Sequence, residues 1–427
     1  MPITALGFLA VFSIGCLVAL KRPYVGLLLY FFVYYMHPPG KYWGSFLPEM
    51  RWTLIVALIT LISTFIHEKN LKAWLKPKET KWLLALFSYI CLQMTWVNYP
   101  SLHQEYLVLL FKLVILYFII VTLVNTEKRL IGVIVANAIG AAYIGLEAIQ
   151  THQSGRFEAA GLPGIKDGNL LAIHLIPIIL MTSVLILTNI KRRYLVFFPL
   201  ALVANLFFMT GSRGGLVGLV IAGLFFIWYS PKEKKTQVFK WAGIAALLGS
   251  MLLGPLIAER MNKVINAQEN EEVDKSAYTR IVVIEAQWEM FKDNPVLGFG
   301  HRGTLIQSPY YVAEEYMTET AIGGRRASHN ITMSFLVDHG LVGSFFFLFL
   351  VVGAVYKVKI VNAVFEKNPR VALVLLSCSS GLLGVMVSSQ FSNSKVLEIS
   401  IWMIALIAAI SLIMKKDEKH NLLDKDE

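Results

Sequence analysis

The chain has 427 residues, of which 56% are hydrophobic and only 16% charged, and its mean hydropathy is +0.60. A soluble globular protein carries about a quarter charged residues, so the composition excludes an ordinary soluble domain. The net charge of +11 does not indicate a nucleic-acid partner, because the long polar segment 258–328 is acidic and the positive excess lies in short loops between apolar segments.

Apolar segments long enough to cross ~30 Å of hydrocarbon recur from end to end. Backbone groups in lipid must be hydrogen-bonded within the protein, and the short alternating strands of a barrel are missing. We therefore predict an all-α polytopic membrane protein with about 12–13 transmembrane helices. The segment 24–36 is short, and the two segments flanking Lys21-Arg22-Pro23 form either separate spans or a re-entrant pair. The predicted spans are 3–20, 24–36, 52–66, 82–97, 105–124, 130–150, 169–189, 194–210, 213–229, 239–257, 330–356, 371–390 and 396–414.

Basic loops alternate with loops that are poor in Lys and Arg. By the positive-inside rule the basic set faces the cytoplasm, and the C-terminal tail 415–427 lies there too. The segment 258–328, with eight Lys or Arg against eleven Asp or Glu, then lies on the opposite side, periplasmic or extracellular. The basic loops are 67–81, 191–193, 232–240 and 357–370. The loops that are poor in Lys and Arg are 98–105, 151–168 and 388–395.

The chain divides into four regions. These are N-terminal helices (1–150), central helices (151–257), the long loop (258–328), and C-terminal helices with a tail (329–427). The N-terminus lacks a basic region and a cleavage site, so we expect the first apolar segment to be retained. The three cysteines lie in apolar segments, which suggests neither a disulfide nor a cysteine-based metal site.

The long loop 258–328 is the segment around which we expect function to be organised, as a lid and half of an active site. Apolar residues at helical spacing over 274–291 predict an amphipathic helix on the membrane surface, which ends at Asn294-Pro295. After it, Gly298-Phe299-Gly300 predicts a tight turn and Gly323-Gly324 a hinge. The apolar positions of the helix are Ile281, Ile284, Trp288 and Phe291.

Several arginines are candidates for binding an anion, because a guanidinium suits a pair of phosphate oxygens. Arg213 lies between glycines at a membrane boundary, where it either binds an anion or extends to the interface. Arg280 opens the amphipathic helix, and Arg325-Arg326 follow the predicted hinge; each could also be a solvated surface charge. Weaker candidates are Arg156, Arg260, His301 and Arg302.

His329 lies where the polar loop returns to apolar sequence, on the same predicted side as Arg213. A histidine at a helix start is commonly a cap or packing residue, but this position favours a functional one. Asp338 and His339 lie deeper in the same predicted helix, where carboxylates tend to face the protein interior and to be functional. No metal-binding, Walker or dinucleotide motif occurs in the sequence.

Three motifs follow one another in order. Gly211-Ser-Arg-Gly-Gly215 contains a Ser-Arg-Gly element. Arg280, Trp288 and Asn294-Pro-Val-Leu-Gly-Phe-Gly300 form Arg…Trp…Pro-x-x-Gly-x-Gly. Ser328-His-Asn330 and Asp338-His-Gly-Leu-Val-Gly343 complete the set. Together they resemble the O-antigen ligase/polymerase superfamily, polytopic enzymes that move glycans from undecaprenyl diphosphate to an acceptor on the periplasmic face.

Ala19-Leu-Lys-Arg-Pro-Tyr-Val-Gly26 and Tyr35-Met-His-Pro-Pro39 narrow the resemblance. They are similar to the exosortase-associated putative O-glycosylation ligases, as is Asp338-His-Gly340. Asp338 stands where that family has Glu, and Asp167-Gly-Asn169 replaces Asp-Asn-Asn.

The resemblance implies a GT-C-like membrane enzyme of polysaccharide or lipopolysaccharide biosynthesis, or of protein O-glycosylation, in the bacterial inner membrane. It implies that His329 is the catalytic base, that Arg213 and Arg280 bind the diphosphate of a lipid-linked donor, and that no metal or other cofactor is needed. Arg325 and Arg326 are added as candidate substrate-binding residues. The implied partners are an undecaprenyl-diphosphate-linked glycan and a lipid or protein acceptor.

Two other functions stay open at the level of sequence. A polymerase that extends the lipid-linked glycan would share the fold, the donor and the His/Arg chemistry. A transporter with a gating loop would usually show repeated halves with broken helices at matching positions, and the sequence has no such repeat.

Overall fold

The computed structural model describes residues 1–152, 155–158, 161–188, 193–244, 247, 271–317, 325–395 and 397–423. Over these residues the chain is helical and contains no strand, which confirms the predicted all-α class. Short 3₁₀ turns join some of the helices. The helices are α1 (Ile3–Lys21), α2 (Pro23–Met36), α3 (Trp52–His67), α4 (Lys78–Gln93), α5 (Pro100–Leu123), α6 (Glu127–Thr151), α7 (Gly168–Leu187), α8 (Phe197–Met209), α9 (Arg213–Tyr229), α11 (Glu271–Asp293), α12 (Gly303–Tyr311), α13 (Ile331–Tyr356), α14 (Val361–Lys367), α15 (Pro369–Ser388) and α16 (Glu398–Leu423).

Seven helices of the described chain are long and apolar enough to cross a membrane, and three shorter apolar helices accompany them. The protein is therefore a polytopic membrane protein. Every predicted apolar segment except 239–257 coincides with a helix. Most of that segment lies outside the described residues, as do Arg260, residues 191–192 and the predicted hinge at Gly323-Gly324. The number of crossings, 12–13, stays a prediction.

The centre of the bundle is formed by α7 and α15, the two most buried of the seven long helices. Their close approach to α9 depends on small residues. A methyl group on Gly218 of α9 would lie 2.6 Å from the carbonyl oxygen of Gly384 of α15. One on Gly381 would lie 2.6 Å from Pro177 Cβ in α7. Small residues at helix contacts replace the hydrophobic driving force that lipid removes.

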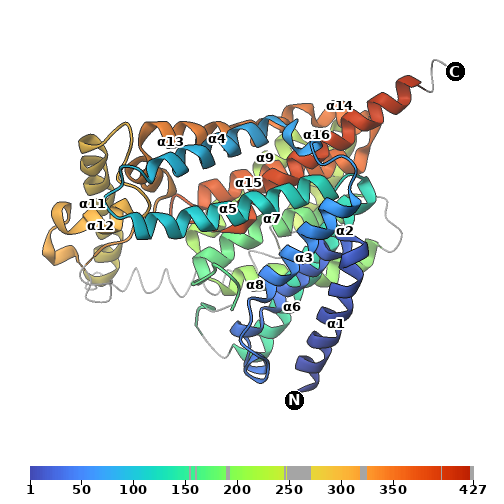
Figure 1. The fold of residues 1–427 in the computed structure, drawn as a ribbon, viewed down its shortest axis with the longest axis horizontal. Helices are drawn as coiled ribbons and strands as arrows, with labels where there is room; N and C mark the ends of the chain where they lie inside the picture. The colour runs from blue at the N-terminus through green and yellow to red at the C-terminus, as the bar shows by residue number, and fades with distance from the viewer. Residues whose placement is uncertain are drawn as a thin grey trace.

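The two helices of the long loop lie together at one end of the bundle, whereas the last turns of α16 project from the opposite end (Figure 1). This arrangement agrees with the prediction that the loop and the C-terminal tail lie on opposite sides of a membrane. We call the first of these ends the loop end. It brings α11 and α12 against the start of α13.

The predicted amphipathic helix is confirmed as α11, and it ends at Asp293, directly before Asn294-Pro295. The face that packs on the protein is not the face predicted to lie on the membrane surface. Val283, Ala286 and Met290 are buried, together with Phe291. Ile281, Ile284 and Trp288 are exposed instead. The helix thus has two apolar faces, because its polar residues occupy only part of the circumference.

Candidate active site

The residue before His329 is held by a side chain of α11 that also contacts α12. Gln287, fully buried in α11, donates from Nε2 to the hydroxyl of Ser328 at 2.9 Å and to that of Thr304 in α12 at 3.0 Å. The Ser328 hydroxyl in turn accepts from the backbone N–H of Asn330 at 3.1 Å. The segment that carries His329 is therefore fixed relative to α11 and α12.

On its other side, the same segment is held by the loop between α15 and α16. Asn330 caps α13, because its Oδ1 accepts from the N–H of Met333 at 2.9 Å. Its Nδ2 donates to the carbonyl oxygen of Gln390 at 3.3 Å, and the N–H of Ile331 donates to that of Ser389 at 2.9 Å. These contacts orient the start of α13 against the end of α15.

His329 keeps an exposed surface, yet surrounding atoms desolvate part of its ring. This partial burial, followed by the positive charges of Arg280 and Arg326, lowers the pKa of His329 below its usual value of about 6.5, while Asp167 raises it. The imidazole is therefore mainly neutral near pH 7 and able to accept a proton. Two predicted arginines and one carboxylate therefore lie close enough to His329 to influence its charge.

Arg213 is the first residue of α9, and its position is set by the loop that also holds the start of α13. The hydroxyl of Ser388 donates to the carbonyl oxygen of Gly214 at 2.9 Å. A side chain at Gly214 would meet Phe391, since its Cβ would lie 2.7 Å from Phe391 Cβ. The neighbours of Arg213 and of His329 thus both contact one segment, 388–391.

The predicted anion-binding arginines have guanidinium groups that are available to a ligand. Within the described residues, no hydrogen bond or ion pair engages the guanidinium of Arg213, Arg280 or Arg325. The backbone N–H of Arg326 donates to Ser308 of α12 at 2.7 Å, which fixes Arg326 near His329. Cationic side chains beside a neutral histidine suit an anionic substrate.

The weaker candidates have structural contacts. Arg156 donates to the carbonyl oxygen of Thr210 at 2.6 Å and to Asn169 Oδ1 at 2.7 Å. The same Asn169 oxygen accepts from Ser212, the cap of α9, at 2.9 Å. Arg156 therefore links the end of α8 to the starts of α7 and α9.

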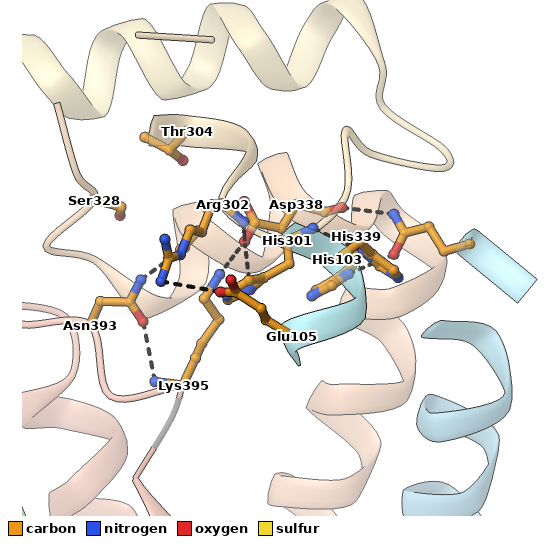
Figure 2. Close-up of polar contacts among 12 residues, drawn as sticks. His103, Glu105, His301, Arg302, Thr304, Ser328, Asp338, His339, Asn393 and Lys395 are labelled. Atoms are coloured by element: carbon orange, nitrogen blue, oxygen red, sulfur yellow. Dashed lines mark hydrogen bonds and ion pairs between the residues drawn. The ribbon is translucent and has the colours of Figure 1, made fainter. Parts of the chain in front are cut away.

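A second polar cluster lies at the loop end of the bundle, around Asp338 (Figure 2). The Asp338 side chain is fully buried and forms an ion pair with Lys395, whose side chain is 4% exposed. The same carboxylate oxygen accepts from the backbone N–H of Arg302 at 3.1 Å. His301 Nδ1 lies 3.9 Å from it, and the His301 ring stacks on Tyr106 with ring centroids 4.3 Å apart.

Burial, and then the charges of Lys395 and Arg302, lower the pKa of His301 to about 2. His301 is therefore neutral at physiological pH and is not a counter-ion for Asp338. The Arg302 side chain turns outward, with its guanidinium 3.7 Å from the Glu105 carboxylate. Neither residue contacts His329 in the structure, so the cluster is separate from the predicted site.

Asp338 marks a break in α13. Gly340 has φ 61° and ψ −165°, which interrupts the helix. Residues 295–300 supply the missing hydrogen bonds, because the N–H of Leu341 donates to Pro295 O at 2.8 Å and that of Gly300 donates to Asp338 O at 2.8 Å. Gln93 of α4 also donates to Asp338 O, at 2.8 Å. The motif Asn294–Gly300 and the motif Asp338–Gly343 therefore pack against each other.

The contact requires glycine on both sides. Gly298 has φ 70°, and a methyl group there would lie 2.5 Å from the Gly340 nitrogen. A methyl group on Gly340 would lie 2.3 Å from Val296 O. Gly298 and Gly300 both have positive φ. The chain turns at 295–297, closed by the N–H of Gly298 on Asn294 O at 3.2 Å, and bends at Phe299, so the predicted tight turn lies just before Gly298-Phe299-Gly300.

Four residues of these clusters were not predicted from the sequence. One of them is His103, whose Nδ1 accepts from the backbone N–H of His301 at 3.1 Å. The others are Gln93, Gln287 and Lys395. Lys395 carries a signal that could have found it. It is a single cation in a loop assigned to the side where cations are rare, so a buried carboxylate partner is expected. Gln287 has no such signal, because a glutamine on a loop helix is ordinarily solvated. No group of three or more His, Cys, Asp or Glu suited to a metal occurs among the residues that the structure describes.

Residues 198–348 match the family model of the O-antigen ligase. The matched region contains Arg213, Arg280, Arg325, Arg326 and His329. It supports the O-antigen ligase/polymerase superfamily and a membrane enzyme of that type. It includes neither the N-terminal motifs that suggest the exosortase-associated group nor Lys395. No curated protein matches the chain.

Proposed function

We propose that the protein is a membrane glycosyltransferase of the ligase type. It moves a glycan from an undecaprenyl-diphosphate carrier to a hydroxyl of a lipid or protein acceptor, at the periplasmic face of the bacterial inner membrane. The observation that carries the proposal is the neutral His329 beside Arg280 and Arg326, on a segment held from both sides. The exosortase-associated group, with a protein or lipid acceptor, is the branch that the N-terminal motifs favour.

In the proposed reaction, His329 accepts the proton of the acceptor hydroxyl as its oxygen attacks the anomeric carbon. The attack comes from the face opposite the diphosphate, so the anomeric configuration inverts. The bond between the anomeric carbon and the diphosphate oxygen breaks, and its electron pair stays with the diphosphate. The proton passes from His329 to solvent. A base with a pKa near or below neutrality is suited to this step.

The diphosphate gains negative charge as the anomeric bond breaks. Guanidinium groups already in place around it stabilise that charge, and no side chain must move to do so. In the proposal Arg280, Arg326 and Arg325 contact the diphosphate from the loop side, and Arg213 from the end of α9. This set of cations is the reason to propose a metal-independent reaction. Since the diphosphate is a good leaving group, paired carboxylates of the glycosidase kind are unnecessary.

The test is in vitro transfer from an undecaprenyl-diphosphate glycan by the purified protein, with His329→Ala and a matched His67→Ala control. His67 is an exposed histidine at the end of α3, in the predicted cytoplasmic loop. We expect the wild type and His67→Ala to release undecaprenyl diphosphate in the presence of EDTA, and the rate of His329→Ala to fall by at least about 100-fold. Equal release from both variants would remove His329 as the base.

The product distinguishes the remaining functions. One glycan on each lipid or peptide acceptor supports a ligase. A ladder of repeat units on the carrier means a polymerase. Movement of the intact lipid-linked glycan across a vesicle membrane, without cleavage, means a transporter.

A further inference from the structure

The ion pair between Asp338 and Lys395 is buried although it lies at the end of the bundle where the polar loop packs. Their side chains are 0% and 4% exposed. Removing two charges from water is unfavourable, and apolar residues of similar size often give equal or greater stability. A buried ion pair is therefore better explained by the single arrangement of chain segments that it specifies than by its contribution to the stability of the fold.

Three segments meet at this pair. Asp338 belongs to α13 at its break, Lys395 belongs to the loop between α15 and α16, and the N–H of Arg302, from the long loop, donates to the same carboxylate oxygen at 3.1 Å. Figure 2 shows the Lys395 and Arg302 contacts converging on Asp338. The pair thus fixes the 393–395 segment to the broken helix.

A second contact strengthens this attachment. The Nδ2 of Asn393 donates to the hydroxyl of Ser334 in α13 at 2.9 Å, and its Oδ1 accepts from the N–H of Lys395 at 3.2 Å. The C-terminal end of the segment 388–395 is therefore held to α13. Its N-terminal end, residues 388–390, contacts the residues beside His329 and beside Arg213.

These near-end contacts are the hydrogen bonds already described. Ser389 and Gln390 accept from Ile331 and Asn330, the two residues after His329. Ser388 donates to Gly214, the residue after Arg213. The segment 388–395 is consequently the structural link between the candidate base and a candidate diphosphate-binding arginine.

We propose that Lys395 and Asp338 are positioning residues, whose ion pair fixes the segment 388–395 and thereby the spacing between His329 and Arg213. The inference rests on the proposed function for the roles of those two residues. A misplacement of about 1 Å between a base and a bound substrate lowers the rate of the chemical step by up to about 100-fold, with less effect on binding.

The test compares the full-length wild type with Asp338→Asn/Lys395→Met, which keeps side-chain size and leaves no unpaired charge. We expect kcat to fall at least about tenfold while KM for the lipid-linked donor changes by less than about threefold. The acidic limb of the pH profile, which reports His329, should stay in place. Asp338→Glu, which retains the pair, should restore most of the activity. A wild-type kcat in the neutral double variant would overturn the proposal.

A measurement independent of activity separates this inference from the proposed function. Spin labels are attached at Arg213→Cys and His329→Cys, both at exposed positions, after replacement of the three native cysteines. The distance distribution should be narrow with Asp338 and Lys395 present, and broader or shifted in the neutral double variant. An unchanged distribution would contradict positioning, whether or not the wild type transfers glycans.

If the double variant does not fold, Ser388→Ala tests whether the segment 388–395 positions Arg213. It removes only the hydrogen bond from the linking segment to Gly214 and introduces no charge. We expect it to lower kcat without a comparable change in donor KM. A folded Ser388→Ala protein with wild-type kcat would mean that this segment does not position Arg213.

Discussion

At the scale of single residues, the site is characterised by the charges around His329. Arg280 and Arg326 favour the neutral imidazole, whereas Asp167 favours the protonated one. Asp167 also caps α7, since its Oδ1 accepts from the N–H of Leu170 at 2.9 Å. The two effects can be separated, because asparagine caps a helix about as well as aspartate but carries no charge.

This balance predicts opposite pH shifts for two variants. With His329 as the base, transfer is lost as the pH falls through its pKa, so the wild-type profile has an acidic limb below about pH 6.5. Arg326→Gln should move that limb to higher pH, and Asp167→Asn to lower pH, each by roughly half a pH unit. The measurement is kcat/KM against pH. Shifts of the same sign, or none, would show that another group titrates.

At the scale of elements, the break in α13 is the feature on which the loop end depends. The left-handed conformation of Gly340 and its contact with residues 295–300 leave no room for a side chain. The break places the Asp338 carbonyl within reach of Gly300 and Gln93. An unbroken helix would use that carbonyl internally, and the long loop would lose its docking position.

Gly340→Ala should therefore destabilise the protein by at least about 2 kcal/mol. Gly353 provides a matched control in the same helix, because a methyl group there has nothing within 4 Å. Gly353→Ala should be neutral or stabilising by up to about 1 kcal/mol. Thermal unfolding in detergent measures both, and equal midpoints for the two variants would argue that the break is not required.

At the scale of the whole molecule, the loop helices and the end of α16 lie at opposite ends of the bundle (Figure 1). From the charge distribution we propose that these ends face the periplasm and the cytoplasm respectively. Tyr310 of α12 is 78% exposed, and Lys72 lies in the basic loop 67–81 and is exposed as well. The two positions can report the sidedness of the protein.

In a cysteine-free background, Tyr310→Cys should react with a membrane-impermeant thiol reagent added to spheroplasts. Lys72→Cys should react only after the membrane is permeabilised. Labelling in the reverse order would place the candidate active site in the cytoplasm and would exclude a periplasmic transferase.

The sequence by itself determined the fold class, the positions of the apolar helices that the structure describes, and the α11 helix and its end. It could do so because the apolar length of a span, helical periodicity and proline are local properties of the chain. It also predicted, from residue type alone, a turn directly after α11, although the turn lies at 295–297 rather than at Gly298-Phe299-Gly300. The assignment of Ile281, Ile284 and Trp288 to one apolar face did not reveal which face would be covered by protein.

Only the tertiary structure decided which distant groups meet. Lys395 pairs with Asp338 across 57 positions of sequence, and Gln287 reaches Ser328 across 41. It also decided that residues 295–300 complete the hydrogen bonds of a broken helix, a partnership that neither motif encodes alone. The physical reason is that a buried polar group must find a partner, but the choice of partner depends on how the helices pack.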